Sequence, residues 1–429
     1  MSTATSAGRT APHALRWWIL VLLFLAMTVN ILDRQVLSLV APVLRDQFHL
    51  SNTQYGTIVM AFLLGMTAGQ IPVGMLMDRK GARFGFVLII AWWSAANMLH
   101  AFARSVAQFS VLRFLLGWGE CGTYSGGVKV IGQWFPARER ALAAGLFNSG
   151  SLAGAILAPP LIVFLMLRFG WPSAFLIPSL TGFLWLLPWL LLFHEPHHHP
   201  RLSEAERAGY APPSGAAGAA RLPVGPLLGL SAVWGVVLMR AFGGPVTHFY
   251  WYWLPEYLKR ERGMSLEMIG LLAWLPFFTG GLGNIAGGWF SSRLIARGWN
   301  VDPARKLAFY LATALCLGAV LVPAAPNAGL ALALICLASL GINAFAANLM
   351  GILTDLFPQR ILARVSAITG VGDGAMSMTM MLVTGMVVDR FSYLPVFIGA
   401  GLFPVISLAS LLVLVRRIRP VFGTERPAQ

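Results

Sequence analysis

Two acids and two bases interrupt long apolar stretches of the chain. Asp33 and Arg34 are adjacent in the first such stretch, and Arg113 and Glu120 lie close together in another. A charge at the centre of a membrane helix costs roughly 2.5–3.5 kcal/mol on insertion scales, so it needs a charged partner, water or a function. We therefore expect these four side chains to meet inside an otherwise apolar protein.

The four side chains suit the binding of a small organic anion together with protons. An arginine fork holds both oxygens of a carboxylate, and such bonds strengthen in a low dielectric. Burial disfavours the charged form of a carboxyl group, whereas a nearby arginine favours it. Arg34 is therefore the first candidate for a substrate carboxylate and Arg113 the second, while Asp33 and Glu120 are candidates for proton coupling. The alternative is a fixed salt-bridge network that only holds the two helices together.

Helical spacing places these residues on defined faces. In the stretch with Glu120, polar or small residues follow at intervals of four, three, four and three: Arg113, Gly117, Glu120, Tyr124 and Gly127. In the first stretch Asn30, Arg34 and Ser38 recur every four residues, and Asp33 lies about 100° round from Arg34. Each polar stripe must therefore look into a cavity or a partner helix.

The elements that carry these side chains are predicted membrane helices. The chain has 429 residues, of which 57% are hydrophobic and 11% charged, with a mean hydropathy of +0.71, which excludes a soluble globular protein. A spanning helix needs about 20 mostly apolar residues. Twelve stretches qualify: 15–42, 52–77, 84–102, 106–133, 139–166, 172–193, 226–254, 266–292, 305–324, 328–353, 362–388 and 393–415. We predict an all-α membrane protein with twelve transmembrane helices.

The net charge of +15 follows the predicted topology and does not require a polyanionic partner. With both termini cytoplasmic, 20 of the 31 Lys and Arg residues fall inside, 7 fall outside and 4 lie within helices. This asymmetry is the positive-inside pattern. We expect a multi-pass protein in contact with membrane lipid, without a nucleic acid partner. The first apolar run continues into a full span, so no removable signal peptide is expected.

One polar segment divides the chain. Residues 194–225 include His197, His198 and His199 and a run rich in Pro, Gly and Ala. Adjacent histidines in such a tract lack fixed ligand geometry, so we interpret the segment as a solvated linker without a metal. The predicted organisation is a cytoplasmic tail 1–14, a six-helix bundle 15–193, a cytoplasmic linker 194–225, a six-helix bundle 226–415 and a cytoplasmic tail 416–429.

The two predicted halves repeat each other. An ungapped shift of 214 residues pairs Gly74 with Gly288 and Arg79 with Arg293. Such repeats are typical of transporters built from two similar bundles, in which the substrate site lies near the middle of the membrane. The repeat therefore favours transport by alternating access.

The run Gly74-Met-Leu-Met-Asp78-Arg79-Lys80-Gly81-Ala82-Arg83 resembles the signature of the major facilitator superfamily. The resemblance implies twelve helices in two six-helix bundles. An acid in this position can hydrogen-bond a helix N-terminus, and the bases can pair with acids. We therefore predict that Asp78, Arg79, Arg83 and, in the second copy, Arg293 act in gating. Ser292 stands in that copy where the first has Asp78; the alternative is that all are ordinary loop charges.

Within that superfamily the chain resembles the anion:cation symporter family, most of all its hexuronate transporter branch. The resemblance rests on the stretches 30–34, 113–124, 134–140 and 249–257. It implies a monomer of the bacterial inner membrane that carries a sugar acid with protons and needs no cofactor. It also implies that Asp33 and Glu120 are proton positions and that Arg34 and Arg113 are carboxylate positions.

The hydroxyl groups of a sugar acid need neutral hydrogen-bonding partners. The polar residues available in the predicted helices are Asn30, Gln70, Tyr124, Asn148, His248, Tyr252, Asn284, Asn343 and Asn348. Trp251 or Trp253 is a candidate for stacking on a sugar ring or, alternatively, for anchoring the chain at the membrane interface.

Five further ionisable residues are less informative. Arg240 is expected either to extend its charge toward the interface or to pair, and Asp373 either to contact substrate or to pair with Arg240. Lys129 is expected to extend its charge to the interface. Asp355 and Asp389 lie at predicted helix ends and are interpreted as loop charges.

Two other functions remain open. A proton-driven exporter of small molecules usually carries a Gly-Pro dipeptide in the fifth helix, which residues 145–154 lack. A transporter-like ligand sensor typically loses one coupling acid, whereas both are present here. An enzyme is not expected, because the sequence has no nucleophile elbow, phosphate loop or metal-ligand spacing.

Overall fold

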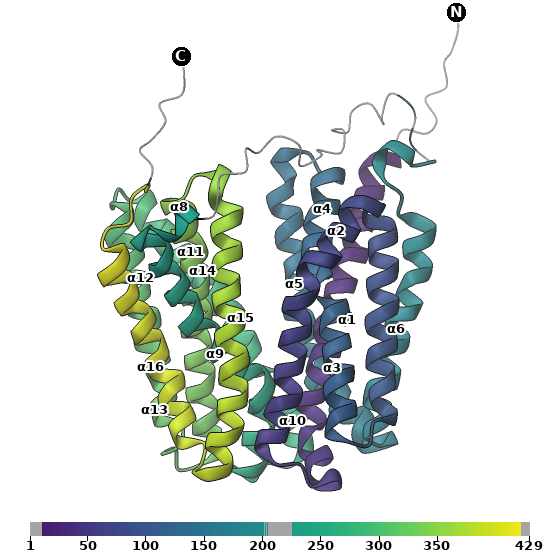
Figure 1. Ribbon diagram of the computed structural model, residues 1–429, viewed down its shortest axis with the longest axis vertical. Helices are drawn as coiled ribbons and strands as arrows, with labels where there is room; N and C mark the ends of the chain where they lie inside the picture. The colour runs from purple at the N-terminus through teal and green to yellow at the C-terminus, as the bar shows by residue number, and fades with distance from the viewer. Residues whose placement is uncertain (1–10, 201, 203, 205–224, 422–429) are drawn as a thin grey trace, which may run out of the picture. The chain divides into compact units, whose positions relative to one another are not determined.

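The computed structural model describes residues 11–200, 202, 204 and 225–421, and its regular elements are helices (Figure 1). The first half contains α1 (Ala11–Phe48), α2 (Asn52–Leu99), η1 (His100–Phe102), α3 (Val106–Glu120), α4 (Gly122–Trp134), α5 (Ala137–Phe169), α6 (Trp171–Leu192) and η2 (Pro196–His198). The second half contains α8 (Gly225–Leu228), α9 (Ser231–Arg260), α10 (Leu266–Leu272), α11 (Leu275–Ala296), α12 (Val301–Cys316), α13 (Gly318–Leu321), α14 (Ala328–Leu356), α15 (Gln359–Arg390), α16 (Leu394–Ser410) and η3 (Leu411–Val415).

Each of the twelve predicted spans falls on helix. Two of them lie in α2, which is interrupted at Gly81, where φ is +81° and ψ is 165°. Another is divided between α3 and α4 by a turn at Cys121. In the described part of the chain, nine helices are long and apolar enough to cross a membrane, and one of them, Asn52–Phe102, holds two predicted spans. The predicted all-α membrane fold is therefore confirmed.

The chain forms two compact units. The first contains Met1–Val36, Leu64–Ala158 and Leu165–Gly218, and the second contains Leu37–Leu63, Pro159–Phe164 and Ala219–Gln429. Thus α1, α2 and α5 each contribute residues to both units. The division into bundles 15–193 and 226–415 stays a prediction, and most of its tails and linker (1–10, 205–224 and 422–429) lies outside the described residues.

In the first unit, close helix contacts position the charged residues of α1. A Cβ on Gly150 or Gly154 would lie 2.5 Å from the carbonyl oxygen of Phe24 or Thr28, respectively. The Thr28 hydroxyl also donates to the carbonyl of Gly150 across the contact, at 3.2 Å. Small residues let membrane helices approach closely enough to gain van der Waals contact. The contact therefore fixes α5 against α1 just before the segment that carries Asp33.

The second unit is built around α9 and α14. The helices α14, α15 and α16 pack against α9, and α11 and α12 pack against α14. In Figure 1, α9, α15 and α16 run alongside one another in this unit. The start of α2 also belongs here, because Gly56 leaves room for the backbone of Met381 and Gly385 leaves room for Asn52. Two helices that are far apart in the sequence thus meet without intervening side chains.

The segment after α6 is more ordered than a solvated linker. His199 is buried, and its ring meets that of Trp134 edge-on at a centroid distance of 5.5 Å. Its Nε2 lies 3.2 Å from the carbonyl oxygen of Leu192. The solvated-linker interpretation was therefore wrong for His199, whose ring fills a space beside α4. In the part of the chain that the structure describes, no three His, Cys, Asp or Glu side chains gather as metal ligands would.

Candidate functional site

The two strongest candidates from the sequence form an ion pair inside the first unit. Arg34 of α1 donates from Nε to Oε2 of Glu120, the last residue of α3, at 3.0 Å. The Glu120 side chain is fully buried, whereas that of Arg34 keeps 17% of its exposure. Oε1 of Glu120 accepts no hydrogen bond from the residues described. The arginine of this pair is thus partly accessible, whereas its acid is enclosed.

Neutral side chains tie this pair to a third helix. Arg34 donates from Nη2 to Oδ1 of Asn30 at 3.1 Å, and Asn30 donates from Nδ2 to the hydroxyl of Thr123 at 3.2 Å. The Thr123 hydroxyl donates to the carbonyl oxygen of Glu120 at 3.1 Å. The sequence reasoning included Asn30 but missed Thr123, because a threonine in an apolar helix carries no local signal. The resulting ring of bonds orients the guanidinium.

Asp33 turns toward a different helix from its neighbour Arg34. It is fully buried, and its Oδ1 accepts a hydrogen bond from Nδ2 of Asn97 in α2 at 2.9 Å. The charges of Arg113 and Glu120 both act on Asp33, and the charges of Arg34 and Arg113 act on Glu120. The two acids and two arginines therefore form one electrostatic group, as the sequence predicted. Asn97 was missed, because an amide partner on a distant helix cannot be read from spacing.

Arg113 is far more enclosed than Arg34. Only 1% of the residue is exposed, and its Nη1 lies 3.4 Å from the carbonyl oxygen of Arg34. A buried guanidinium next to a backbone carbonyl and two carboxylates is well placed to hold positive charge at the site. Because Arg34 is the more accessible arginine, the geometry favours it over Arg113 for direct contact with an incoming anion.

The residues of the polar face predicted for α3 and α4 differ in their exposure. Arg113, Gly117, Glu120 and Gly127 are buried, but Tyr124 is 56% exposed and stacks on Phe147 at a centroid distance of 6.1 Å. Gln70 and Asn148 are also exposed.

In the second unit, some of the predicted residues are buried or bonded within the protein. The Tyr252 carbonyl accepts the hydroxyl of Tyr55 at 2.6 Å, and Trp253 is fully buried against the Tyr55 ring. Asn343 donates to the carbonyl of Ser339, and Asn348 to that of Gly287. Asn284 is exposed. Burial leaves Trp253 neither at the membrane interface nor open for stacking.

Arg240 and Asp373 pair with each other. Nε of Arg240 in α9 donates to Oδ2 of Asp373 in α15 at 3.2 Å, with 28% and 18% of the side chains exposed. Arg240 could extend toward the interface or pair, and Asp373 could contact substrate or pair with Arg240; the structure shows the pair. The second unit thus holds an arginine–carboxylate pair of its own.

Comparison with known proteins places this architecture in a family. The sequence profile of the Major Facilitator Superfamily matches residues 23–327. The chain belongs to the Major Facilitator Superfamily. This membership also confirms the expectation of a transporter and not an enzyme.

Curated relatives of this superfamily member cover most of both chains. The hexuronate transporter of Escherichia coli (strain K12) is 28% identical over 399 residues, which are 92% of each chain. A probable galactarate/D-glucarate transporter of the same strain is 30% identical over 90% of this chain and 92% of the relative. The galacturonate transporter of Dickeya chrysanthemi is 31% identical over 71% of this chain and 90% of the relative. The resemblance to the hexuronate transporter branch is therefore confirmed.

Solved structures of the superfamily share the fold. A bacterial homolog of the human lysosomal transporter Spinster matches with a TM-score of 0.72 at 20% identity, over 96% of each chain. A D-xylose-proton symporter matches with a TM-score of 0.74 at 17% identity, over 95% of this chain and 99% of the other. At these identities the likeness shows the fold alone, and it agrees with twelve membrane helices.

The superfamily signature forms an ion pair within the first unit. Lys129 of α4 donates to Oδ1 of Asp78 at 2.8 Å and to the carbonyl of Met77 at 2.7 Å. Lys129 therefore extends its charge to an acid that is itself 74% exposed. Arg83 donates to the carbonyl of Leu190 at 2.7 Å.

Residues of the superfamily signature line a polar cavity of about 430 Å³. Its lining includes Asp78, Arg79, Arg83, Lys129 and Glu195. Because Gly81 has a positive φ and no Cβ, the Glu195 carboxylate can sit against it and accept the N–H of Ala82 at 3.2 Å. The signature loop is thus tied to the segment after α6.

The second copy of the signature is organised differently. Arg293 is exposed, and Ser292 replaces the acid. The neighbouring hydroxyl of Ser291 accepts a bond from Arg305 at 2.8 Å, and Arg305 pairs with Asp355 at 3.0 Å. Asp355 is therefore a structural ion-pair partner and not the loop charge that was expected.

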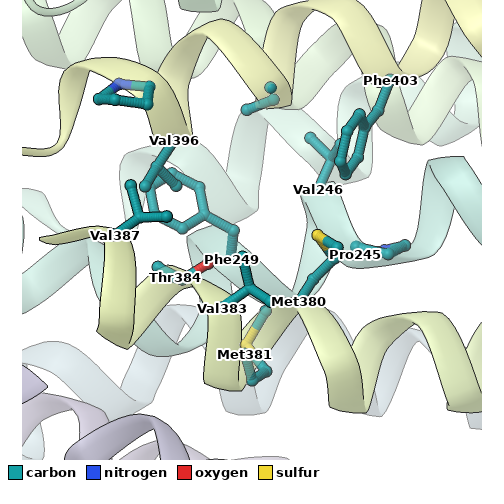
Figure 2. Close-up of a pocket in the computed structure, with 13 residues that line it drawn as sticks. Pro245, Val246, Phe249, Met380, Met381, Val383, Thr384, Val387, Val396 and Phe403 are labelled. Atoms are coloured by element: carbon teal, nitrogen blue, oxygen red, sulfur yellow. The ribbon is translucent and has the colours of Figure 1, made fainter. Parts of the chain in front are cut away.

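An apolar cavity in the second unit is unsuited to a carboxylate. It has a volume of about 280 Å³ and lies between α9, α15 and α16. Figure 2 shows Phe249, Val396 and Met380 around it, and Thr384 supplies the one hydroxyl of its lining. Burying a charged group without hydrogen-bond partners carries a large desolvation cost. The candidate substrate site is therefore the charged cluster of the first unit.

Proposed function

We propose that this chain is a secondary active transporter that carries a sugar acid, most plausibly a hexuronate, together with protons by alternating access. The single observation that carries the proposal is the Arg34–Glu120 pair, in which an accessible arginine is held by one oxygen of a fully buried acid. The names of the relatives, which are transporters of hexuronate, galacturonate and galactarate or D-glucarate, support the substrate class.

Arg34 binds the substrate carboxylate in this proposal. Its guanidinium offers a planar fork of donors, and its Nε is the group now bonded to Glu120. A carboxylate ligand competes with Glu120 for the same donor, so the arginine cannot serve both fully at once. The bond to Asn30 persists through the exchange and keeps the fork aimed.

Glu120 and Asp33 take up the coupled protons. A protonated Glu120 no longer attracts Arg34 as an ion, so proton binding prepares the arginine for the anion. The substrate then neutralises the Arg34 guanidinium, and the loaded site changes its side of access. After release of substrate and proton, the Arg34–Glu120 pair forms again. The buried bond from Asn97 orients Asp33 near the same charges.

The remaining assignments extend the proposal to the whole chain. Asn30, Gln70, Tyr124, Asn148, His248, Tyr252, Asn284 and Asn343 stay candidates for the hydroxyl groups of the substrate. Asp78, Arg79, Arg83 and Arg293 act in gating, in the first copy through the Asp78–Lys129 pair. The protein works as a monomer in the bacterial inner membrane, surrounded by lipid, with both termini cytoplasmic.

Uptake into proteoliposomes tests the proposal. The purified protein is reconstituted, and entry of radiolabelled galacturonate is followed with and without an inward proton gradient. Glucuronate, galactonate, glucarate and a lipophilic cation serve as competitors. We expect uptake that the gradient stimulates and that uronates block. Transport of another sugar acid would retain the symporter and remove the hexuronate assignment, whereas movement of the cation alone would contradict the role of Arg34.

A further inference from the structure

In the second unit, a series of hydrogen-bonded ionisable and hydroxyl groups connects two helices. It runs from Arg240 and His248 on α9 to Asp373 and Ser377 on α15. Asp373 lies near the middle of α15, a helix of 32 residues, and therefore at the depth of the membrane interior. The proposed function assigns no role to this carboxylate.

Four hydrogen bonds link these groups. Arg240 donates to Oδ2 of Asp373 at 3.2 Å, and the hydroxyl of Ser377 donates to Oδ1 at 3.2 Å. Oγ of Ser377 lies 3.1 Å from Nδ1 of His248. The same Nδ1 lies 3.0 Å from the carbonyl oxygen of Gly244. Asp373 and His248 are therefore connected through one buried hydroxyl.

The donor and acceptor capacities of these groups determine where the protons lie. An ionised carboxylate only accepts, so Ser377 gives its hydrogen to Asp373 and accepts from His248. A carbonyl also only accepts, so Nδ1 of His248 carries a proton in order to bond Gly244. Both neighbours thus select the same tautomer, in which Nε2 is the basic nitrogen. The imidazole is oriented by the carboxylate through the hydroxyl.

The backbone leaves room for this arrangement. Arg240, Gly244, His248 and Tyr252 are spaced by four and share one face of α9. A Cβ on Gly244 would overlap Oδ1 of Asp373. The His248 ring lies nearly parallel to that of Tyr252, with 9° between the planes and 6.2 Å between the centroids. The carboxylate is therefore seated in a space that only glycine leaves open.

Other elements that pack on α15 bring no competing charge. The helix α16 contains no Asp, Glu, His, Lys or Arg, and neither does the start of α2 from Asn52 to Leu63. The one charged residue of α14 is Asp355, which pairs with Arg305. On α9, Arg240 bonds Asp373 directly and His248 is linked to it through Ser377, whereas Glu256, Lys259 and Arg260 lie more than two turns beyond His248.

We propose that Asp373 and His248 together form a second proton-binding site of the transport cycle. A proton binds at Nε2 of His248. The Nδ1 proton then moves to the oxygen of Ser377 while the Ser377 hydroxyl proton moves to Asp373. One N–H and one O–H bond break and two O–H bonds form, which leaves a neutral imidazole and a neutral carboxyl group. Arg240 thereby loses its counter-ion, and its charge favours an arriving anion.

This inference rests on the proposed function and predicts its proton stoichiometry. In proteoliposomes with the membrane potential clamped at zero, the equilibrium accumulation of radiolabelled galacturonate is measured against the proton gradient. Loss of one coupled proton lowers the accumulation about tenfold for each pH unit of gradient. We expect this loss in Asp373→Asn and His248→Gln. Ser377→Ala, which breaks the connection without removing either titratable group, is expected to shift the pH dependence of uptake.

The matched control is Asp355→Asn, which removes the acid of the Arg305 pair in the same unit. It is expected to keep the wild-type dependence of accumulation on the gradient. If the wild type itself shows no response to the gradient, the proposed function fails. If the wild type responds and the Asp373, His248 and Ser377 variants keep its proton ratio and pH dependence, only the second proton site is overturned.

Discussion

Two arginines of α1, eleven residues apart, are paired in contrasting ways. Arg34 meets one acid, Glu120, and keeps part of its surface accessible. Arg45, in the second unit, bonds both a buried acid, Glu256, and the carbonyl oxygen of Leu50. Arg260 bonds the same oxygen of Glu256 and also Asp46. We name Arg45, Asp46, Glu256 and Arg260 the helix-end network.

The difference separates an exchangeable pair from a structural one. In the helix-end network one carboxylate oxygen serves two guanidinium groups, so loss of one partner leaves other charges uncompensated. Close by, Asp389 accepts the backbone N–H groups of Asn52 and Thr53 at 2.9 and 2.7 Å, capping the start of α2 from another helix. The expected loop charge is therefore a helix cap. Several bonds hold the ends of these helices together, whereas the ion pair of Arg34 joins its Nε to one oxygen of Glu120.

Removal of Arg34 should have the largest effect on transport. Arg34→Ala leaves Glu120 buried without its partner and removes the proposed carboxylate ligand. Truncating one partner of a buried charge pair costs about 2–5 kcal/mol, so we expect a fall in uptake of roughly 30-fold or more. The measurement is the initial rate of galacturonate uptake.

Arg45→Ala is the matched control, since it removes another paired arginine of the same helix. The folded fraction of this variant should bind substrate with the wild-type affinity. If Arg45→Ala weakens substrate affinity as strongly as Arg34→Ala, the distinction between the two pairs is wrong.

Glu256→Ala should have the largest effect on stability. It leaves Arg45 and Arg260 without their shared acceptor, and breaking a buried pair costs about 3–5 kcal/mol. Denaturant unfolding of the protein in detergent measures the change. Replacing both Arg45 and Glu256 by Met should recover much of the loss. A change below about 1 kcal/mol in the single variant would show that solvent screens the network.

Asp389→Ala should have a moderate and local effect. The loss of a helix cap costs about 0.5–2 kcal/mol, and the freed N–H groups of Asn52 and Thr53 should exchange with deuterium faster. Ser51→Ala is a matched control, because Ser51 caps the N–H of Gln54 in the same turn. Unchanged exchange at residues 52 and 53 in Asp389→Ala would contradict the cap.

Lys129→Met should have the smallest effect on stability. Its partner Asp78 is 74% exposed, and exposed ion pairs contribute about 0.2–1 kcal/mol. We expect a decrease in unfolding free energy of less than about 1 kcal/mol. A larger decrease would show that the Asp78–Lys129 pair stabilises the fold, as the helix-end network is proposed to do.

The sequence predicted the fold and the charged members of the site because these follow local rules. Length and hydropathy identify membrane helices, and a charged residue within an apolar helix is recognisable as a candidate site residue. Asn97 and Thr123 were missed, because neutral partners on distant helices leave no pattern along the chain. The environment of Asp389 depends on a contact between α15 and α2, which periodicity cannot reveal.

The central claim is that protonation of Glu120 drives release of Arg34. The most direct test is Glu120→Gln in proteoliposomes, because glutamine keeps the size of the side chain and an acceptor for Arg34 but cannot take up the proton. The account predicts that an inward proton gradient stimulates galacturonate uptake less than in the wild type, by the one coupled proton that Glu120 carries, while exchange of labelled for unlabelled galacturonate persists. Stimulation by the gradient equal to that of the wild type would contradict it.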